Sequence, residues 1–351
     1  MAPQTKKEER VMLRQMILGL LVGIPFGYAL QRGRYCMQTA FRDILLARDF
    51  TLFRAYILAV LVQMILVHVF AQMGWVTITR APSFWLAAML GGFIFGIGMV
   101  LAGGCASGTW YRVGEGMVGS MVALVGFVIG ATLTDTHLKP VVASLRSFTL
   151  GDPRSLAELL RINPWVLIAL FTLVGGLWLV RSPQSPYQRG WSWYQTGLII
   201  GVIAALAWIA SGATGRNYGL SVVQPAASIG HFIASGRTDA LNWGTFMLLG
   251  IPLGAFISAR AAGEFKKRVP KPQRLVQQFG GGLIMGLGGV LAGGCNIGNG
   301  LTGASVFAIS SILAVIFIIL GTWTAVYGMF MVDWDSVFRP REKEKKYIKA
   351  S

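Results

Sequence analysis

Three cysteines are the residues of this chain whose type and spacing could do chemistry. Cys105 and Cys295 each end the pentapeptide Leu-Ala-Gly-Gly-Cys, within segments 91–108 and 281–298 that match at twelve of eighteen positions. Cys36 follows Gly-Arg-Tyr. A thiol is a weak hydrogen-bond donor and a soft, polarizable contact, which favours a substrate containing sulfur or selenium over a phosphate or carboxylate. Internal repeats of glycine-broken apolar segments are typical of membrane transporters, whose halves meet at the substrate site.

Each Gly-Gly-Cys sequence predicts a sharp break in an apolar helix, because glycine adopts the positive φ at which helices often end. The small polar residues that follow begin a new helix, whose free N–H groups attract anions. Arginines beside the cysteines would offset an anion's charge inside the membrane. The candidate substrate-binding residues are the three cysteines and their hinge or polar neighbours: Cys36, Cys105, Cys295, Arg34, Gly104, Gly294, Asn296 and Arg112.

Each of these features also has a purely structural interpretation. A buried cysteine often serves as a small apolar filler, and glycine-rich membrane helices usually indicate close packing. Arg34 and its neighbour Arg32 would equally suit a position among lipid headgroups. Close packing explains the glycines of the repeated segments, but it does not explain a duplicated thiol.

Composition predicts an all-α polytopic membrane protein, since 54% of residues are hydrophobic and 13% are charged, against about 25% charged in soluble domains. Segments long enough to span a bilayer are 12–31, 53–74, 84–102, 116–134, 164–181, 192–211, 241–262, 278–294 and 303–332. The windows 84–102 and 278–294 are interrupted by glycines and could be spans, half-helices or re-entrant elements. Two shorter apolar stretches, 35–47 and 219–235, are expected to be short helices that dip into the membrane and return.

The chain divides at a polar, proline-containing stretch near residues 181–190. The first half, 1–182, includes a polar loop at 135–163, and the second half covers 190–338, followed by a basic tail at 339–351. We expect two pseudo-symmetric repeats, whose long helices and short re-entrant helices meet at a central constriction.

The formal net charge of +17 does not indicate nucleic-acid binding, because lysine and arginine gather in loops and tails. Basic loops orient a membrane protein and contact anionic lipids of the bilayer. The loop at 263–274 and the C-terminal tail are therefore predicted to be cytoplasmic.

The segments GRYCMQTAFRD, LAGGCASGTWYRVGEG and LAGGCNIGNGLTG resemble signature segments of the YeeE/YedE family of sulfur-transport membrane proteins, and the resemblance covers essentially the whole chain. Characterised members take up thiosulfate. The resemblance implies that Cys36, Cys105 and Cys295 are pathway cysteines, which pass thiosulfate along by hydrogen bonds without a covalent bond. It also implies a cytoplasmic TusA-like sulfur-carrier partner. Some relatives are linked to selenium compounds, so a selenium substrate is an alternative.

We therefore predict a multi-pass protein of the bacterial inner membrane that takes up thiosulfate or a closely related sulfur anion. No catalytic residue, cofactor or metal site is predicted, and the sequence contains no GxxxxGK[ST] motif for bound ATP. One alternative is a membrane thiol sulfurtransferase or oxidoreductase, which needs an activated thiolate and usually a resolving partner. Another is a transporter of a soft metal such as Cu(I), which thiolates bind well.

Overall fold

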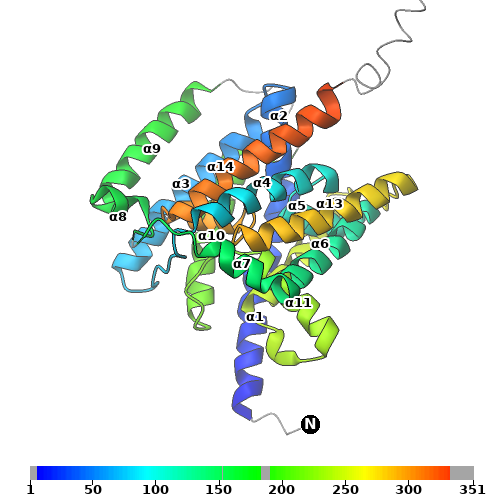
Figure 1. Cartoon of the computed structure of the whole chain (residues 1–351), viewed down its shortest axis with the longest axis horizontal. Helices are drawn as coiled ribbons and strands as arrows, with labels where there is room; N and C mark the ends of the chain where they lie inside the picture. The colour runs from blue at the N-terminus through cyan, green and yellow to red at the C-terminus, as the bar shows by residue number, and fades with distance from the viewer. Residues whose placement is uncertain (1–5, 152, 183–189, 333–351) are drawn as a thin grey trace, which may run out of the picture.

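The computed structural model describes residues 6–151, 153–182 and 190–332, and within these ranges every regular element is helical. The elements run in chain order as α1 (Lys6–Arg32), α2 (Met37–Leu46), α3 (Thr51–Gln72), α4 (Trp85–Ala102), α5 (Ala106–Gly114), α6 (Val118–His137), α7 (Lys139–Arg146), α8 (Leu156–Leu160), α9 (Pro164–Arg181), α10 (Trp193–Gly212), α11 (Val223–Ser235), η1 (Thr238–Ala240), α12 (Trp243–Ala261), α13 (Pro272–Leu291), η2 (Gly298–Gly303), α14 (Ile309–Val326) and η3 (Tyr327–Met331). Eight helical segments of the described chain are long and apolar enough to cross a membrane, as predicted for a polytopic membrane protein (Figure 1).

Helix positions follow the apolar windows closely, and the two short apolar stretches form α2 and α11. The stretch 135–163, predicted to be a polar loop outside the membrane, contains the end of α6 and the short helices α7 and α8. Helix α8 begins with a capping box, in which Ser155 and Glu158 satisfy each other's backbone N–H groups. The predicted tail at 339–351 lies outside the described residues, as does most of the boundary between the halves.

Glycines allow α1 and α12 to pack backbone to backbone in the same direction. A Cβ atom added to Gly23 would overlap the carbonyl oxygen of Met247, and one added to Gly27 would overlap that of Ile251. A step of four residues along α1 matches a step of four residues in the same direction along α12, so the two helices run parallel. This contact is the small-residue packing expected where lipid supplies no hydrophobic force between helices.

The two glycine-rich repeats form α4 and α13, which pack against each other in opposite directions. Gly91, near the start of α4, faces the backbone of Ala292 just after α13, whereas Gly281 faces Ala102 at the end of α4. The C-terminal ends of α4 and α13 therefore lie at opposite ends of this helix pair. The two cysteine-bearing breaks follow these ends, so they approach the interior from opposite sides.

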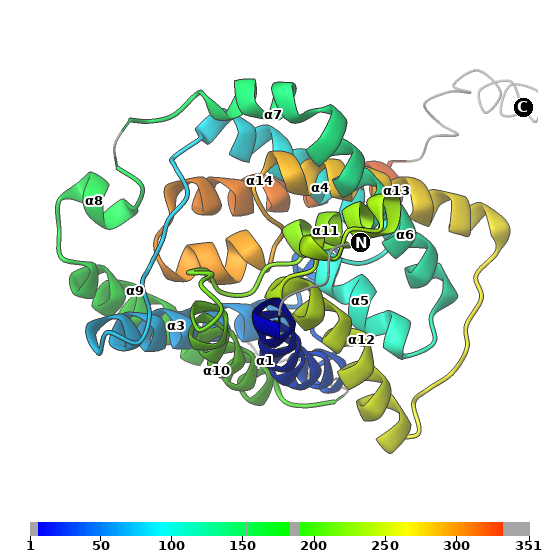
Figure 2. The same ribbon diagram turned by 90° about the horizontal axis from the view of Figure 1, so that it is seen from below.

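A continuous core encloses the breaks, and all three cysteines belong to it. Helix α14 packs on α4, and α6 packs on α13. Helices α8 and α9 lie at the edge of the molecule in both views (Figures 1 and 2). The helix α9 makes its main described contact with α3. The elements that position the cysteines are therefore central, and the peripheral helices do not contribute to them.

Candidate functional site

The first break turns the end of α4 into the start of α5. Gly103 caps α4 in the left-handed conformation with φ of 74°, and Cys105 is the N-cap residue of α5. The sulfur of Cys105 accepts a hydrogen bond from the backbone N–H of Gly108 at 3.3 Å. The sequence-based prediction of a break followed by a new helix is confirmed here, because the thiol lies beside the free N–H groups of a helix start.

Two of the thiols lie together in the interior. Cys36 is the N-cap residue of α2, and its sulfur lies 3.6 Å from the sulfur of Cys105. Both residues are buried, with exposed fractions of 1% and 0%. A Cβ atom on Gly108 would lie 2.9 Å from the Cys36 sulfur and 3.1 Å from the Cys105 sulfur. The absence of a side chain on Gly108 thus lets both sulfurs lie close to the backbone of α5.

Arg112 of α5 folds back onto the break that precedes its own helix. Its Nη1 atom donates a hydrogen bond to the carbonyl oxygen of Gly103 at 2.6 Å. A Cβ atom on Gly104 would lie 2.8 Å from this Nη1 atom, so glycine at this position gives the guanidinium room. The predicted residues Gly104 and Arg112 therefore act together, bringing a positive charge to the C-terminal end of α4.

The second break has a different ending, although it begins in the same way. Gly293 has a φ of 73°, and the Cys295 sulfur accepts a hydrogen bond from the N–H of Ile297 at 3.3 Å. Cys295 is not followed by an α-helix in the way that Cys105 is followed by α5. The chain forms the π-helical turn η2 there. Asn299 donates from Nδ2 to the carbonyl oxygen of Gly294 at 2.9 Å and so closes this break.

Asn299 and two tyrosines are structural residues that the sequence-based prediction did not single out. The hydroxyl of Tyr56 donates to the carbonyl oxygen of Gly300, and that of Tyr218 donates to Gly298, at 2.9 and 2.8 Å. They hold η2 in place. Tyr218 follows a Gly-Arg-Asn sequence that resembles Gly-Arg-Tyr before Cys36, and this was the signal available in the sequence.

Cys295 and Asn296 lie apart from the thiol pair within the same core. Cys295 is fully buried, and its sulfur has no hydrogen bond to either other sulfur among the described residues. Asn296 is also fully buried, yet both its Oδ1 and Nδ2 atoms lack a partner in the part of the chain that the structure describes. Buried amides are normally hydrogen-bonded, so Asn296 offers a donor and an acceptor to a bound molecule or to water.

Arg34 lies at the mouth of the interior rather than in its centre. Its guanidinium forms an ion pair with Glu264 at 2.9 Å, and its side chain remains 41% exposed. Burial raises the pKa of Glu264, but the hydrogen bond from Gln31 and the charge of Arg34 outweigh it and lower this pKa overall. Glu264 therefore stays ionised and holds Arg34 at the edge of the molecule.

Two cavities lead toward the breaks. One, of about 690 Å³, is lined by Arg34 and reaches Arg112 at the break after α4. The other, of about 500 Å³, reaches Gly293 at the break after α13. Since α4 and α13 are antiparallel, we describe these cavities as the Arg112 vestibule and the Gly293 vestibule, one at each end of the helix pair.

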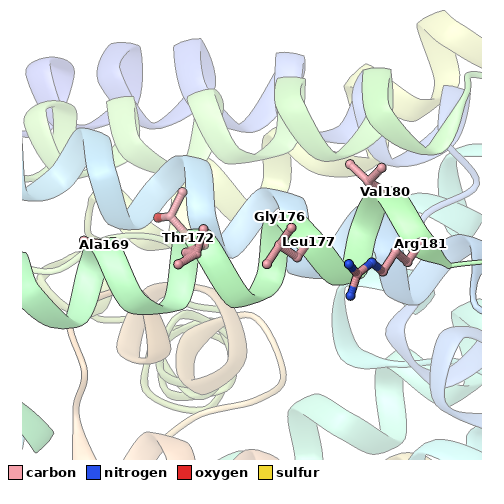
Figure 3. A pocket seen from close by; sticks show the side chains of 7 residues that line it. Ala169, Thr172, Gly176, Leu177, Val180 and Arg181 are labelled. Atoms are coloured by element: carbon pink, nitrogen blue, oxygen red, sulfur yellow. The ribbon is translucent and has the colours of Figure 1, made fainter.

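A third depression lies on the outer side of α9, where Figure 3 shows its side chains from Ala169 to Arg181. It is shallow and almost entirely apolar, and it includes none of the residues at the breaks. This depression suits contact with lipid, so it is not a candidate for the passage of an anion.

Comparison with known proteins shows the family of the chain. A model of the sulphur transport family matches residues 32–324. The chain belongs to this family, known as YeeE/YedE. This membership confirms the resemblance of the three cysteine-containing segments to signature segments of the family. Together with the eight apolar helical segments, it establishes a multi-pass membrane protein.

Two relatives within the sulphur transport family match almost the entire chain. The thiosulfate transporter TsuA of Escherichia coli (strain K12) is 36% identical, over 95% of this chain and 98% of that protein. The thiosulfate transporter TsuA of Spirochaeta thermophila is 38% identical, over 89% of this chain and 98% of that protein. A probable transporter YedE of Salmonella typhimurium is 36% identical over 33% of this chain and 28% of that protein.

Oxidation is expected to join Cys36 to Cys105 and to leave Cys295 free. Their sulfurs are 3.6 Å apart, so a shift of about 1.5 Å brings them to the disulfide length of ~2.05 Å. With copper phenanthroline and dioxygen as the oxidant, each thiol loses one proton and one electron. Peptide mapping of the purified protein after alkylation measures the result, and a crosslinked peptide that contains Cys295 would contradict the described arrangement.

Proposed function

We propose that the protein carries thiosulfate, or a closely related sulfur anion, across the bacterial inner membrane into the cytoplasm. The main support is the burial of three thiols in one core, two of them at the starts of α2 and α5 with their sulfurs 3.6 Å apart. The names of the two relatives that match almost the full chain support the same substrate. The protein acts as a transporter and not as an enzyme.

In the proposed mechanism, thiosulfate moves between the cysteines by hydrogen bonding without a covalent bond. Moving a dianion out of water is costly unless donors replace its hydration. The guanidinium of Arg112, which has N–H groups besides the one bonded to Gly103, and the Nδ2 atom of Asn296, which has no partner among the described residues, are the donors available near the thiols for this purpose. Thiols bind anions weakly, and a series of weak binding sites allows an ion both to enter and to leave the pathway.

We further propose that residues 1–182 and 190–338 are pseudo-symmetric repeats of opposite orientation. The antiparallel packing of α4 and α13 supports this, as does the position of α10. Gly33 at the end of α1 contacts Thr196 near the start of α10, so α10 begins where α1 ends. In this arrangement α2 and α11 are the short re-entrant helices, and each precedes a long helix of its own half.

The Arg112 vestibule is proposed to open to the cytoplasm. Arg268 lines it, and this residue belongs to the basic 263–274 loop, which the positive-inside rule places on the cytoplasmic side. The Gly293 vestibule then opens to the outside. A TusA-like carrier would receive thiosulfate at the basic loop, close to the exit of the pathway.

A membrane thiol sulfurtransferase is the second candidate, because clustered thiols also suit persulfide chemistry. Such an enzyme needs a base to generate the thiolate. The described hydrogen-bond partners of the Cys105 sulfur are the N–H of Gly108, the hydroxyl of Ser107 and the thiol of Cys36. No carboxylate or imidazole is among them, which favours transport.

Radiolabelled thiosulfate uptake in cells tests this proposal. Cys105→Ala and Cys295→Ala are each expected to lower uptake about 10- to 100-fold, because each removes the one hydrogen bond that a thiol donates to an anion, worth ~1.5–3 kcal/mol. Membrane protein levels must match the wild type. Unchanged uptake in both variants would refute the pathway, whereas a persulfide on either cysteine, found by mass spectrometry, would favour the enzyme.

Competition by selenite and selenosulfate shows whether a selenium anion is preferred.

A further inference from the structure

Arg146, at the end of α7, reaches the break that carries Cys295. Its Nη2 atom donates a hydrogen bond to the carbonyl oxygen of Val290 in the last turn of α13. The same atom lies 3.7 Å from the position of a Cβ atom on Gly293. The Nε atom of Arg146 is buried and has no partner among the described residues. A half-buried guanidinium with unused donors therefore lies directly beside Gly293.

This contact corresponds to the one that Arg112 makes at the first break. Arg112 bonds the carbonyl oxygen of Gly103 after α4, whereas Arg146 bonds that of Val290 in α13. The last carbonyl groups of a helix carry partial negative charge, which would repel an approaching anion. In both places a guanidinium from a different helix neutralises this charge and still has further N–H groups to donate, since arginine has five.

The Gly293 vestibule has the chemistry to receive an anion. Lys139 and Arg146 both line it, and Phe84 packs its ring 5.1 Å from the Arg146 guanidinium carbon. A planar guanidinium stacked on an aromatic ring is held in a fixed orientation. The acidic residue among the described lining residues is Asp135, whose carboxylate bonds the His231 ring at 2.9 Å.

We propose that Arg146 binds the oxyanion end of the doubly charged substrate in the Gly293 vestibule, before the substrate reaches Cys295. This inference rests on the proposed transport of thiosulfate and adds an entry site to it. Arginine binds sulfur oxyanions through paired N–H donors. Sulfate has the same oxyanion face, so it competes at this site. The site sets the affinity for the substrate, and the thiols carry out the later transfer.

Uptake kinetics of radiolabelled thiosulfate in cells test the role of Arg146. Arg146→Gln is expected to raise KM at least about tenfold, equivalent to ~1.4 kcal/mol, with Vmax within twofold of the wild type. Arg146→Lys keeps the charge and is expected to restore part of the affinity. Arg181→Gln is the matched control, because it removes a positive charge on α9, away from both vestibules, and its KM should change less than threefold. Inhibition by sulfate should weaken in Arg146→Gln alone.

The outcomes separate this inference from the proposed function. One outcome is that the wild type takes up thiosulfate, Cys295→Ala abolishes this uptake, and Arg146→Gln leaves KM unchanged. This outcome would overturn the entry site and leave the proposed transport function intact. A fall in Vmax at constant KM, or equal losses in Arg146→Lys and Arg146→Gln, would show a structural role and also overturn it. Absence of thiosulfate uptake by the wild type would instead overturn the proposed function itself. Thermal unfolding of each purified variant identifies any loss of folded protein.

Discussion

Replacing Gly108 with valine is expected to abolish thiosulfate uptake while the protein remains folded. A Cβ atom at this position lies 2.9 Å from the Cys36 sulfur and 3.1 Å from the Cys105 sulfur, closer than carbon and sulfur pack. The two methyl groups of valine add to this overlap and push the two sulfurs apart, so a substrate can no longer contact both thiols together. Gly108→Ala adds the Cβ atom alone, and rotation of Cys36 accommodates part of it. Uptake should therefore fall in the order glycine, alanine, valine, with about a tenfold loss for alanine, equivalent to ~1.4 kcal/mol.

The matched control is Gly176→Val on the outer side of α9. A Cβ atom there meets no other atom within 4 Å, so uptake and stability should both match the wild type. Normal uptake by Gly108→Val at a normal protein level would show that the substrate does not pass between Cys36 and Cys105. Size-exclusion chromatography in detergent and thermal unfolding establish whether Gly108→Val is folded.

Replacing Gly27 with valine is expected to prevent stable packing of α1 on α12. The new Cβ atom would overlap the carbonyl oxygen of Ile251, which belongs to a helix backbone and cannot rotate away. Overpacking of this kind costs about 1–3 kcal/mol or more, and here the whole helix must shift. We expect the midpoint of thermal unfolding in detergent to fall by about 5 °C or more, or the protein to be degraded in cells. An unfolding midpoint equal to that of Gly176→Val would contradict this packing.

The breaks were predictable because they depend on local chemistry. Two consecutive glycines after an apolar run can adopt positive φ, and the structure places Gly103 and Gly293 there. The cysteine that follows each pair then lies beside backbone N–H groups. These properties belong to residues that are neighbours in sequence, so inspection of the sequence is enough to infer them.

Contacts between distant segments were not predictable in the same way. Arg146 lies in a polar stretch that hydropathy assigns to the aqueous loops, yet it bonds a carbonyl oxygen 144 residues away. Arg34 looked equivalent to Arg112 in sequence, but Glu264 from a distant loop pairs with it at the surface. The sequence shows which side chains are charged, whereas the tertiary fold decides which group each charged side chain contacts.

The backbone contact between α1 and α12 also limits how this protein can move. Carbonyl groups of one helix meet glycines of the other with no flexible side chain between them, and close-packed interfaces switch between discrete arrangements rather than sliding freely. Large hinge motions at this seam would break several contacts at once. In the proposed pathway, ion transfer through such a rigid frame would depend on rotation of small groups such as thiols, which occurs in picoseconds to nanoseconds for exposed side chains. The proposal then implies that the turnover rate is set by how long each anion stays bound, and not by reorientation of the two halves.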